Sequence, residues 1–404
     1  MRIISEVVSP GVYGQARLTW GWIDLVFGIV FSPFCNYATR AFPEAKIKGW
    51  QNFFNRFCRR TTLDLTLLVG LPFLAGLWIY QRAENQVDFL VLFLAVIYLG
   101  LMSFWSLERS LLLADRWQGR LSLMAIAETW GYPLGILAAV FLLGDRCSSF
   151  FIGWAGFQLV GLSVFYKWGA PRYPREEGPA PAGTLTTWRG DAWRFALPMI
   201  PVGLILWLVR NSSRYLLDWF ESPEKVGVFV ACYGLASQPF TIMGGILARF
   251  FRPIWYTAIE QGRLRRVRFI MVLYFCLAAL ISGAGVILLK MFGPPIVQLI
   301  LAEPYRSGAL DILLWVAAAH GVLATAGVFE IGLYADKRTG THTTVSGLAA
   351  AANLVLSWIL IQDRGMIGAA QATCWTYCIY LFLLAAFYFL GKPSRSGLLT
   401  SGDA

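Results

Sequence analysis

The stretch FALPMIPVGLILWLVRNSSRYLLDWF, residues 195–220, carries an apolar run into a polar end without a break in the hydrophobic pattern. As a helix it is long enough to cross a hydrocarbon core of about 30 Å. Arg210 and Arg214 stand at positions i and i+4, so they share one helix face, and Asp218 continues that stripe. An unpaired charge in lipid is costly. The class of protein therefore depends on what surrounds this helix.

Composition places the whole chain in the membrane class. Of its 404 residues, 57% are hydrophobic and only 14% are charged, whereas about 25% of residues are charged in globular proteins. Apolar windows of about 20 residues, the length of a membrane span, recur along the chain. They lie at 11–39, 61–80, 89–108, 121–143, 148–166, 195–217, 227–250, 269–289, 308–333, 343–361 and 366–390. Windows this long favour helices over barrel strands, so we expect an all-α integral membrane protein with about 11 transmembrane helices.

The net charge of +11 follows a membrane pattern and does not indicate a nucleic-acid partner. Basic residues gather in every second loop between the windows, and these loops hold 24 of the 34 lysines and arginines. They lie at 40–60, 109–120, 167–194, 249–268, 337–338 and 392–395. Positive-inside bias places these loops and the carboxyl terminus in the cytoplasm. With eleven spans the amino terminus is then outside, and residues 1–10, MRIISEVVSP, lack the apolar core of a cleavable signal peptide.

A short internal repeat predicts two related halves. SPGVYG at 9–14 and SPEKVG at 222–227 each open an apolar window, at an offset of 213 residues. A parallel duplication leaves such copies on the same side of the membrane. We infer a six-plus-six ancestral plan, in which the partner of the helix at 195–217 would precede residue 9. Only MRIISEVV stands there, so the first helix of the plan is expected to be missing or truncated.

The two halves are joined by a polar segment. Residues 169–191, GAPRYPREEGPAPAGTLTTWRGD, are rich in Pro and Gly and lie on the predicted cytoplasmic side. We therefore expect an N-terminal transmembrane lobe at 1–167, a cytoplasmic linker at 168–194 and a C-terminal transmembrane lobe at 195–404.

Four stretches resemble one family of transporters. They are SPGVYGQ at 9–15, SPEKVGVFVACYGLASQP at 222–239, EPYRSGALDILLW at 303–315 and AAANLVLSWILIQDRGMIGAAQATCWTYCIYL at 350–381. In order and spacing they are similar to polysaccharide flippases of the multidrug/oligosaccharidyl-lipid/polysaccharide exporter superfamily. The resemblance covers nearly the whole chain and implies two helical bundles around a central cavity that work by alternating access. The chain departs from the family at its first helix.

The resemblance implies a transporter in the bacterial cytoplasmic (inner) membrane and not an enzyme. Its activity would be to flip undecaprenyl-pyrophosphate-linked oligosaccharide from the cytoplasmic to the outer leaflet, for O-antigen or exopolysaccharide biosynthesis. The implied partners are the lipid-linked glycan, the bilayer and a polysaccharide polymerase or export machinery, with no cofactor beyond a coupling proton or sodium ion. One alternative is a cation-coupled drug antiporter of the same superfamily. Another is a membrane glycan polymerase or glycosyltransferase, which the short outside loops disfavour.

Charged and polar residues inside the windows are the candidates for the substrate path. Carrying a pyrophosphate through low dielectric needs fixed cations, and arginine binds phosphate oxygens bidentately. We expect Arg210, Asn211 and Arg214 to contact the head group, together with Arg17 and Asp24 of the first window. The alternatives are that Arg214 reaches the membrane interface with its long side chain and that Arg17 pairs with Asp24.

Asp24 and His320 are the candidates for ion coupling. Asp24 lies near the middle of its window, where an acid either pairs with an arginine or binds a coupling proton or cation. His320, in AAAHGVLATAG at 317–327, could titrate near neutral pH. Its small-residue surroundings also suit close helix packing, so a hydrogen-bonded packing histidine is the other interpretation. The spacing of the seven cysteines indicates neither a zinc site nor a disulfide framework.

The alternating basic loops make a prediction about topology. In a variant without native cysteines, a cysteine placed at Gly397 should react with an impermeant thiol reagent only from the cytoplasm, and one at Ser222 only from outside. Labelling of intact and permeabilised cells measures this. Reversed access at either position would contradict the predicted orientation.

Overall fold

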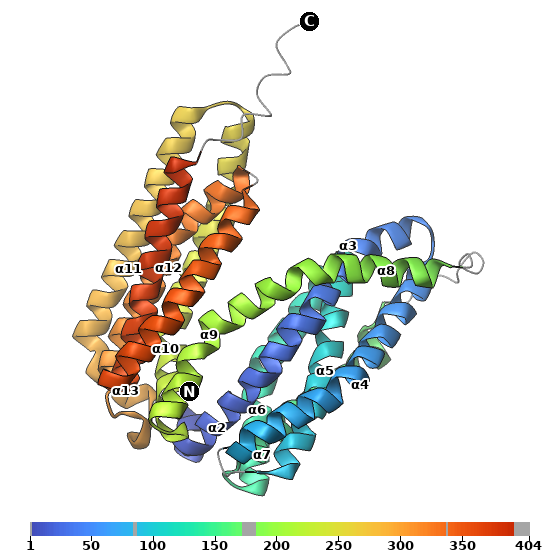
Figure 1. The fold of residues 1–404 in the computed structure, drawn as a ribbon, viewed down its shortest axis with the longest axis horizontal. Coiled ribbons are helices and arrows are strands. Elements are labelled where there is room, and N and C mark those ends of the chain that lie inside the picture. The colour runs from blue at the N-terminus through green and yellow to red at the C-terminus, as the bar shows by residue number, and fades with distance from the viewer. Residues whose placement is uncertain (1, 84–86, 172–182, 337, 392–404) are drawn as a thin grey trace, which may run out of the picture. The chain divides into compact units, whose positions relative to one another are not determined.

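The computed structural model describes residues 2–83, 87–171, 183–336 and 338–391, and all regular secondary structure in these ranges is helical (Figure 1). The chain divides into two compact units. The amino-terminal unit is Val7–Trp207, and the carboxyl-terminal unit joins Met1–Glu6 with Leu208–Ala404. Each unit is described separately below.

Within the described residues, ten helical segments are long and apolar enough to cross a membrane. The last of them, α13 (Thr339–Leu390), contains the two windows predicted at 343–361 and 366–390. Gly365 separates these two halves with φ 56° and ψ −132°, a conformation that glycine adopts readily because it has no Cβ. The ten segments therefore contain the eleven predicted windows. The prediction of an all-α, multi-pass membrane protein is confirmed.

The amino-terminal unit is a bundle that begins with one long apolar segment, Pro10–Ile47. Its helices are α2 (Pro10–Val26), η1 (Phe27–Phe31), α3 (Ser32–Ile47), α4 (Gln51–Ala83), α5 (Phe89–Ala114), α6 (Gln118–Leu143), α7 (Cys147–Val164), η2 (Phe165–Gly169), α8 (Thr184–Ala196), η3 (Leu197–Met199) and the first part of α9 (Ile200–Phe220). The short elements η1 and η2 are π-helical turns that continue α2 and α7.

Glycines allow the helices of this unit to approach closely. A Cβ added at Gly135 of α6 would lie 2.5 Å from the carbonyl oxygen of Gly153 in α7. A Cβ added at Gly203 of α9 would lie equally close to the carbonyl oxygen of Gly28 in η1, at 2.5 Å. No side chain would fit between the two backbones at either place. Small residues favour helix association in membranes because they permit this close approach.

The repeated Ser-Pro motif starts a helix in both places. Pro10 opens α2 after Ser9, and Pro223 opens α10 after Ser222, in each case in the first turn. Proline suits this position because its missing N–H would have no helical partner there. The Ser222 hydroxyl also accepts a hydrogen bond from the backbone N–H of Lys225, at 3.4 Å. The motif therefore marks the start of a membrane helix in each half.

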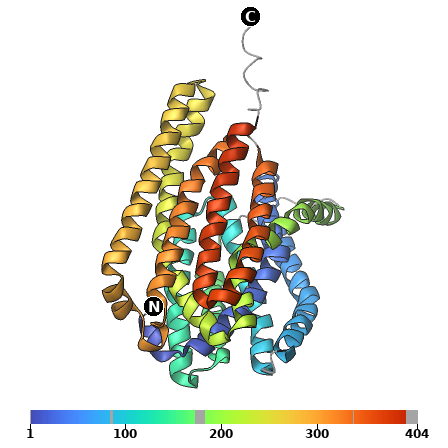
Figure 2. The ribbon, with the colours of Figure 1, turned by 60° about the vertical axis from the view of Figure 1, so that its left-hand side comes forward.

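The carboxyl-terminal unit is arranged around α12. Its helices are α1 (Arg2–Val7), the second part of α9, α10 (Pro223–Glu260), α11 (Leu264–Ile300), η4 (Glu303–Tyr305), α12 (Ala309–Ala335) and α13. Helix α12 packs against α10, α11 and α13 and is the most buried of the candidate spans. Figure 2 shows α11, α12 and α13 side by side. Small residues such as Ala319 and Ala326, both fully buried, allow this central position.

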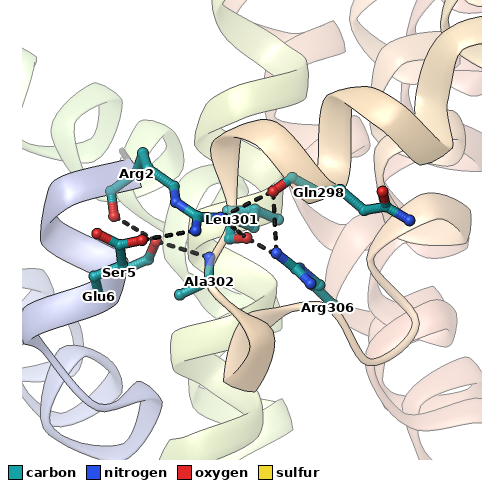
Figure 3. Close-up of polar contacts among 7 residues, drawn as sticks. All are labelled: Arg2, Ser5, Glu6, Gln298, Leu301, Ala302 and Arg306. Atoms are coloured by element: carbon teal, nitrogen blue, oxygen red, sulfur yellow. Dashed lines mark hydrogen bonds and ion pairs between the residues drawn. The ribbon is translucent and has the colours of Figure 1, made fainter.

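Helix α1 is attached to the end of α11 by polar contacts (Figure 3). The guanidinium of Arg2 donates to the carbonyls of Gln298 and Leu301, at 2.8 and 2.9 Å. Arg306 donates to the same two carbonyls from the other direction, at 3.0 and 3.1 Å. Ser5 Oγ accepts from the Ala302 N–H at 3.0 Å. The last carbonyls of a helix lack partners and carry partial negative charge, so two arginines cap this end favourably.

The compact units do not follow the boundaries expected from the sequence. Residues 1–6 were expected in the N-terminal lobe but cluster with the carboxyl-terminal unit through the contacts of α1. Residues 195–207 were expected in the C-terminal lobe but cluster with the amino-terminal unit, where Trp207 Nε1 donates to the Gly21 carbonyl at 2.6 Å. Much of the expected linker, 172–182, lies outside the described residues. The division into two functional lobes stays a prediction.

The glycine contact between α6 and α7 makes a prediction about stability. Gly135→Ala should lower the thermal stability of the purified protein, because its Cβ would meet the Gly153 backbone. Overpacking of this kind costs about 1–3 kcal/mol. The control is Gly156→Ala on α7, where an added Cβ has open space and alanine favours the helix. Thermal unfolding in detergent measures both. Equal stability of the two variants would contradict the close approach.

Candidate functional site

Helix α9 carries the predicted cationic residues, and its two parts belong to different units. The first part is fixed to the amino-terminal unit by the Trp207 hydrogen bond to Gly21 and by the contact between Gly203 and Gly28. The second part, which begins at Leu208, belongs to the carboxyl-terminal unit.

A buried polar seam joins the second part of α9 to α13. The Ser212 hydroxyl donates to Asn353 Oδ1 at 2.8 Å, and Asn353 Nδ2 donates to Thr376 Oγ1 at 3.1 Å. The hydroxyls of Ser213 and Ser357 hydrogen-bond at 2.9 Å. All five side chains are buried. In a low dielectric such bonds have no water to replace them. The seam therefore fixes the rotation of α9 about its axis, and with it the direction of Arg210 and Arg214.

Arg210 and Arg214 lie near a cluster formed by Tyr233 of α10, His320 of α12 and Tyr377 of α13. His320 Nε2 hydrogen-bonds the Tyr233 hydroxyl at 3.0 Å. The imidazole also meets the rings of Tyr233 and Tyr377 edge to face, with centroids 5.3 and 5.5 Å apart. Arg210 and Arg214 both act electrostatically on Tyr233, and Arg210 also acts on Tyr377. Two cationic side chains, Arg210 and Arg214, thus lie beside three rings that carry polar atoms.

Asn211 sets the position of Arg214. The Asn211 side chain is buried and its Oδ1 accepts a hydrogen bond from Arg214 Nη1 at 3.1 Å. Arg214 is half-buried, whereas Arg210 is exposed. The alternative that Arg214 reaches the membrane interface stays a prediction.

Arg17 stands in an aromatic cage in the amino-terminal unit. Its guanidinium lies 5.0 Å from the Tyr13 ring centroid, 5.8 Å from Trp20 and 5.9 Å from Trp154. It donates to the Tyr13 hydroxyl at 2.9 Å, and this tyrosine, not Asp24, is its hydrogen-bond partner within the described part of the chain. Aromatic faces stabilise a cation without neutralising it.

The remaining candidate, Asp24, is a buried residue of α2 in the amino-terminal unit. The structure thus brings Arg210, Asn211, Arg214 and His320 together in the carboxyl-terminal unit. It places Arg17 and Asp24 on one helix of the other unit.

Sequence reasoning missed the aromatic members of both groups. Tyr13, Trp20 and Trp154 surround Arg17, and Tyr233 and Tyr377 surround His320. In a chain with 15% aromatic residues these side chains look like ordinary apolar content. The sequence did offer one chemical indication of these residues. A tyrosine hydroxyl inside a membrane span needs a polar partner.

Comparison with known proteins supports the fold. By sequence, no protein-family model and no curated protein matches the chain. An inward-facing multidrug resistance MATE family transporter of the MOP superfamily is similar in structure, with a TM-score of 0.70, 12% identity, and 94% of this chain and 92% of that one covered. The lipid II flippase MurJ, inward closed, has a TM-score of 0.62 at 12% identity, with 95% and 86% covered. A point mutant of the Vibrio cholerae MATE transporter VcmN has 0.58 at 13% identity, with 94% and 90% covered.

The chain therefore has the fold that these transporters and this lipid flippase share. The prediction of this transporter-like fold is confirmed. The polysaccharide substrate belongs to the proposal below.

The polar seam makes a prediction about packing. Asn353→Ala removes the acceptor of Ser212 and the donor to Thr376. Interhelical hydrogen bonds in membranes contribute about 0.6 kcal/mol on average and at most about 1.7 kcal/mol. For two lost bonds we expect a decrease of about 1–3 kcal/mol in the free energy of unfolding, measured by reversible denaturation in mixed micelles.

The control is Thr343→Ala on the same helix, because the exposed hydrogen bond of the Thr343 hydroxyl runs to the carbonyl of Thr339 one turn earlier in α13. If Asn353→Ala were no less stable than Thr343→Ala, the seam would not hold α9 against α13.

Proposed function

We propose that this protein is a flippase of the MOP superfamily that moves undecaprenyl-pyrophosphate-linked oligosaccharide from the cytoplasmic to the outer leaflet of the bacterial inner membrane. The observation that carries the proposal is the pair Arg210 and Arg214, held beside His320, Tyr233 and Tyr377. It occurs in a fold that transporters and a lipid flippase share.

The arginines suit the charged part of such a substrate. A pyrophosphate crossing the membrane needs partners for its oxygens throughout, because the desolvated anion is very costly. An arginine offers a planar fork of N–H groups that stays charged and matches phosphate geometry. Arg210 is exposed, and Arg214 is oriented by Asn211. The aromatic cage of Arg17 supplies a third cation in the other unit.

The aromatic polar groups suit the glycan. Tyrosine hydroxyls and an imidazole nitrogen can each exchange hydrogen bonds with sugar hydroxyls. Their ring faces offer the flat apolar surface that the C–H face of a sugar ring covers. Tyr233, His320 and Tyr377 come from three different helices, so a shift of any one helix would change all their contacts. Such a cluster can bind differently in two states of a transporter.

Asp24 is the residue that we assign to ion coupling in this proposal. It is buried in the middle of the first apolar segment, where an acid commonly marks a proton or cation path. His320 is then a positioning residue whose hydrogen bond to Tyr233 orders the cluster. A glycan polymerase or export machinery would take up the flipped product outside.

The second candidate is a cation-coupled drug antiporter. It is supported by the likeness to MATE transporters, of which one has a TM-score of 0.70. The charges argue against it. Drugs exchanged for a cation are commonly cationic themselves, and fixed arginines at 210, 214 and 17 would repel them. An anionic substrate removes this conflict.

The proposal predicts the effect of losing the central cation. A charge-assisted contact to an oxyanion contributes about 1.5–3 kcal/mol, so Arg210→Ala should lower flipping about tenfold or more. Arg210→Lys should recover only part, since a point charge lacks the bidentate fork. The assay is complementation of a flippase-deficient strain, scoring surface glycan against protein abundance in the membrane.

The matched control is Arg265→Ala, which removes an exposed arginine at the start of α11. It should leave glycan export unchanged. An Arg210→Ala protein that is abundant and fully active would exclude the cationic site from the substrate path.

A further inference from the structure

A pocket in the amino-terminal unit is lined by none of the candidate site residues described above. Its volume is about 640 Å³, within the range of about 300–1,000 Å³ that is usual for small-molecule sites. It lies between the last turns of α3, the turn that leads to α4, and helix α8. The basic loops at 40–60 and 167–194 place this end of the unit on the predicted cytoplasmic side.

Helix α8 is fixed over this pocket by its aromatic face. The Trp188 indole packs edge to face on Phe54, with centroids 5.0 Å apart, and against Phe57 at 5.5 Å. Ala192 is buried one turn later. Asp191 and Arg194 follow at helical spacing and line the pocket. Helix α8 therefore directs Asp191 and Arg194 toward the pocket, while Trp188 packs on the aromatic residues of α4.

Two arginines of the pocket are available to a ligand. Lys48 Nζ contacts Glu44 Oε1 at 2.6 Å, so these two charges satisfy each other. Arg40 lies over the Phe195 ring at 5.4 Å, and this cation–π contact positions the guanidinium without engaging its N–H donors. Arg40 and Arg194 are both exposed, and neither has an ion pair within the described residues. Asp191, also exposed, is the third charge that faces the pocket.

We propose that this pocket binds a phosphate ester that carries neighbouring hydroxyl groups. The guanidinium forks of Arg40 and Arg194 match phosphate oxygens. Asp191 would repel a bare polyphosphate but accepts hydrogen bonds from hydroxyls, as does Thr187 beside it. Trp50 supplies an aromatic wall for the carbon atoms between them. The site is separate from the one in the proposed function and does not depend on it.

Two sources share this chemistry, a lipid headgroup such as phosphatidylglycerol and a soluble phosphorylated sugar. The surroundings of the pocket favour the lipid. Helix α8 exposes Trp193 and Leu185 and leads into the apolar part of α9 in one continuous candidate span, Thr184–Phe220. Amphipathic helices of this kind lie at the membrane interface, and basic pockets on the cytoplasmic side bind anionic headgroups.

The test uses the full-length protein in detergent and native mass spectrometry with phosphatidylglycerol and phosphatidylcholine. We expect the wild type to retain phosphatidylglycerol in preference to phosphatidylcholine. The double variant Arg40→Gln/Arg194→Gln should lose this preference about tenfold or more. The control Arg60→Gln/Arg189→Gln removes the same charge from the same predicted side, outside the pocket lining, and should behave as the wild type.

Calorimetric titration with glucose 1-phosphate distinguishes the two sources. Retention of phosphatidylglycerol without binding of the soluble ester assigns the site to a headgroup. Saturable binding of glucose 1-phosphate that is lost in Arg40→Gln/Arg194→Gln assigns it to a free sugar phosphate. The proposal is overturned if the pocket variant binds both ligands as the wild type does, or if the control variant weakens binding equally.

Discussion

The buried hydrogen bonds between α9 and α13 hold the candidate site together. Ser212, Asn353 and Thr376 form a continuous chain, and Ser213 and Ser357 add a second contact beside it. Because none of these groups has access to water, rotation of α9 would leave several polar atoms unpaired in a low dielectric. The seam thus determines where the guanidinium groups of α9 lie relative to α10, α12 and α13.

Helix α9 also marks one of two places where the chain passes between the compact units. The boundary inside α9 falls between Trp207 and Leu208, and the other falls between Glu6 and Val7. At the second place α1 is held by Arg2 and Arg306 at the end of α11. The alternating access that the resemblance to polysaccharide flippases implies would require the chain to bend near these positions. The polar contacts on each side provide fixed ends for such a movement.

The sequence predicted the helices well and the partners of the site poorly, for physical reasons. Long apolar windows are required by the membrane itself, so the span at 195–217 and the pair divided near Gly365 were visible without a structure. The helices extend further than their windows, as where α4 begins at Gln51, because polar turns outside the lipid carry no hydropathy signal. The attachment of α1 to α11 could not be predicted in this way, because Arg2 and Gln298 lie 296 positions apart in the sequence.

For the candidate site too, the sequence indicated individual residues but not the side chains that contact them. A charged residue in a membrane span is energetically costly, so its presence there suggests a function. This argument identified Arg17 and Arg210 as candidates. Their surroundings depend on which helices meet. A pair with Asp24 was the local alternative for Arg17, yet Tyr13 accepts its hydrogen bond, and the Trp154 ring of α7 lies 5.9 Å from its guanidinium. The tyrosines that contact His320 come from α10 and α13, and no local pattern in α12 indicates them.

The central claim is that the substrate is an anionic, lipid-linked glycan, and reconstitution tests it most directly. Purified protein would be placed in liposomes that contain a fluorescent undecaprenyl-pyrophosphate oligosaccharide, and exposure of the glycan at the opposite leaflet would be followed with an impermeant glycosidase. Parallel liposomes would report efflux of a cationic dye against a proton or sodium gradient. The account predicts protein-dependent flipping of the glycolipid and no dye transport above protein-free liposomes. Gradient-driven dye efflux without any flipping of the glycolipid would contradict it and assign the chain to the antiporters.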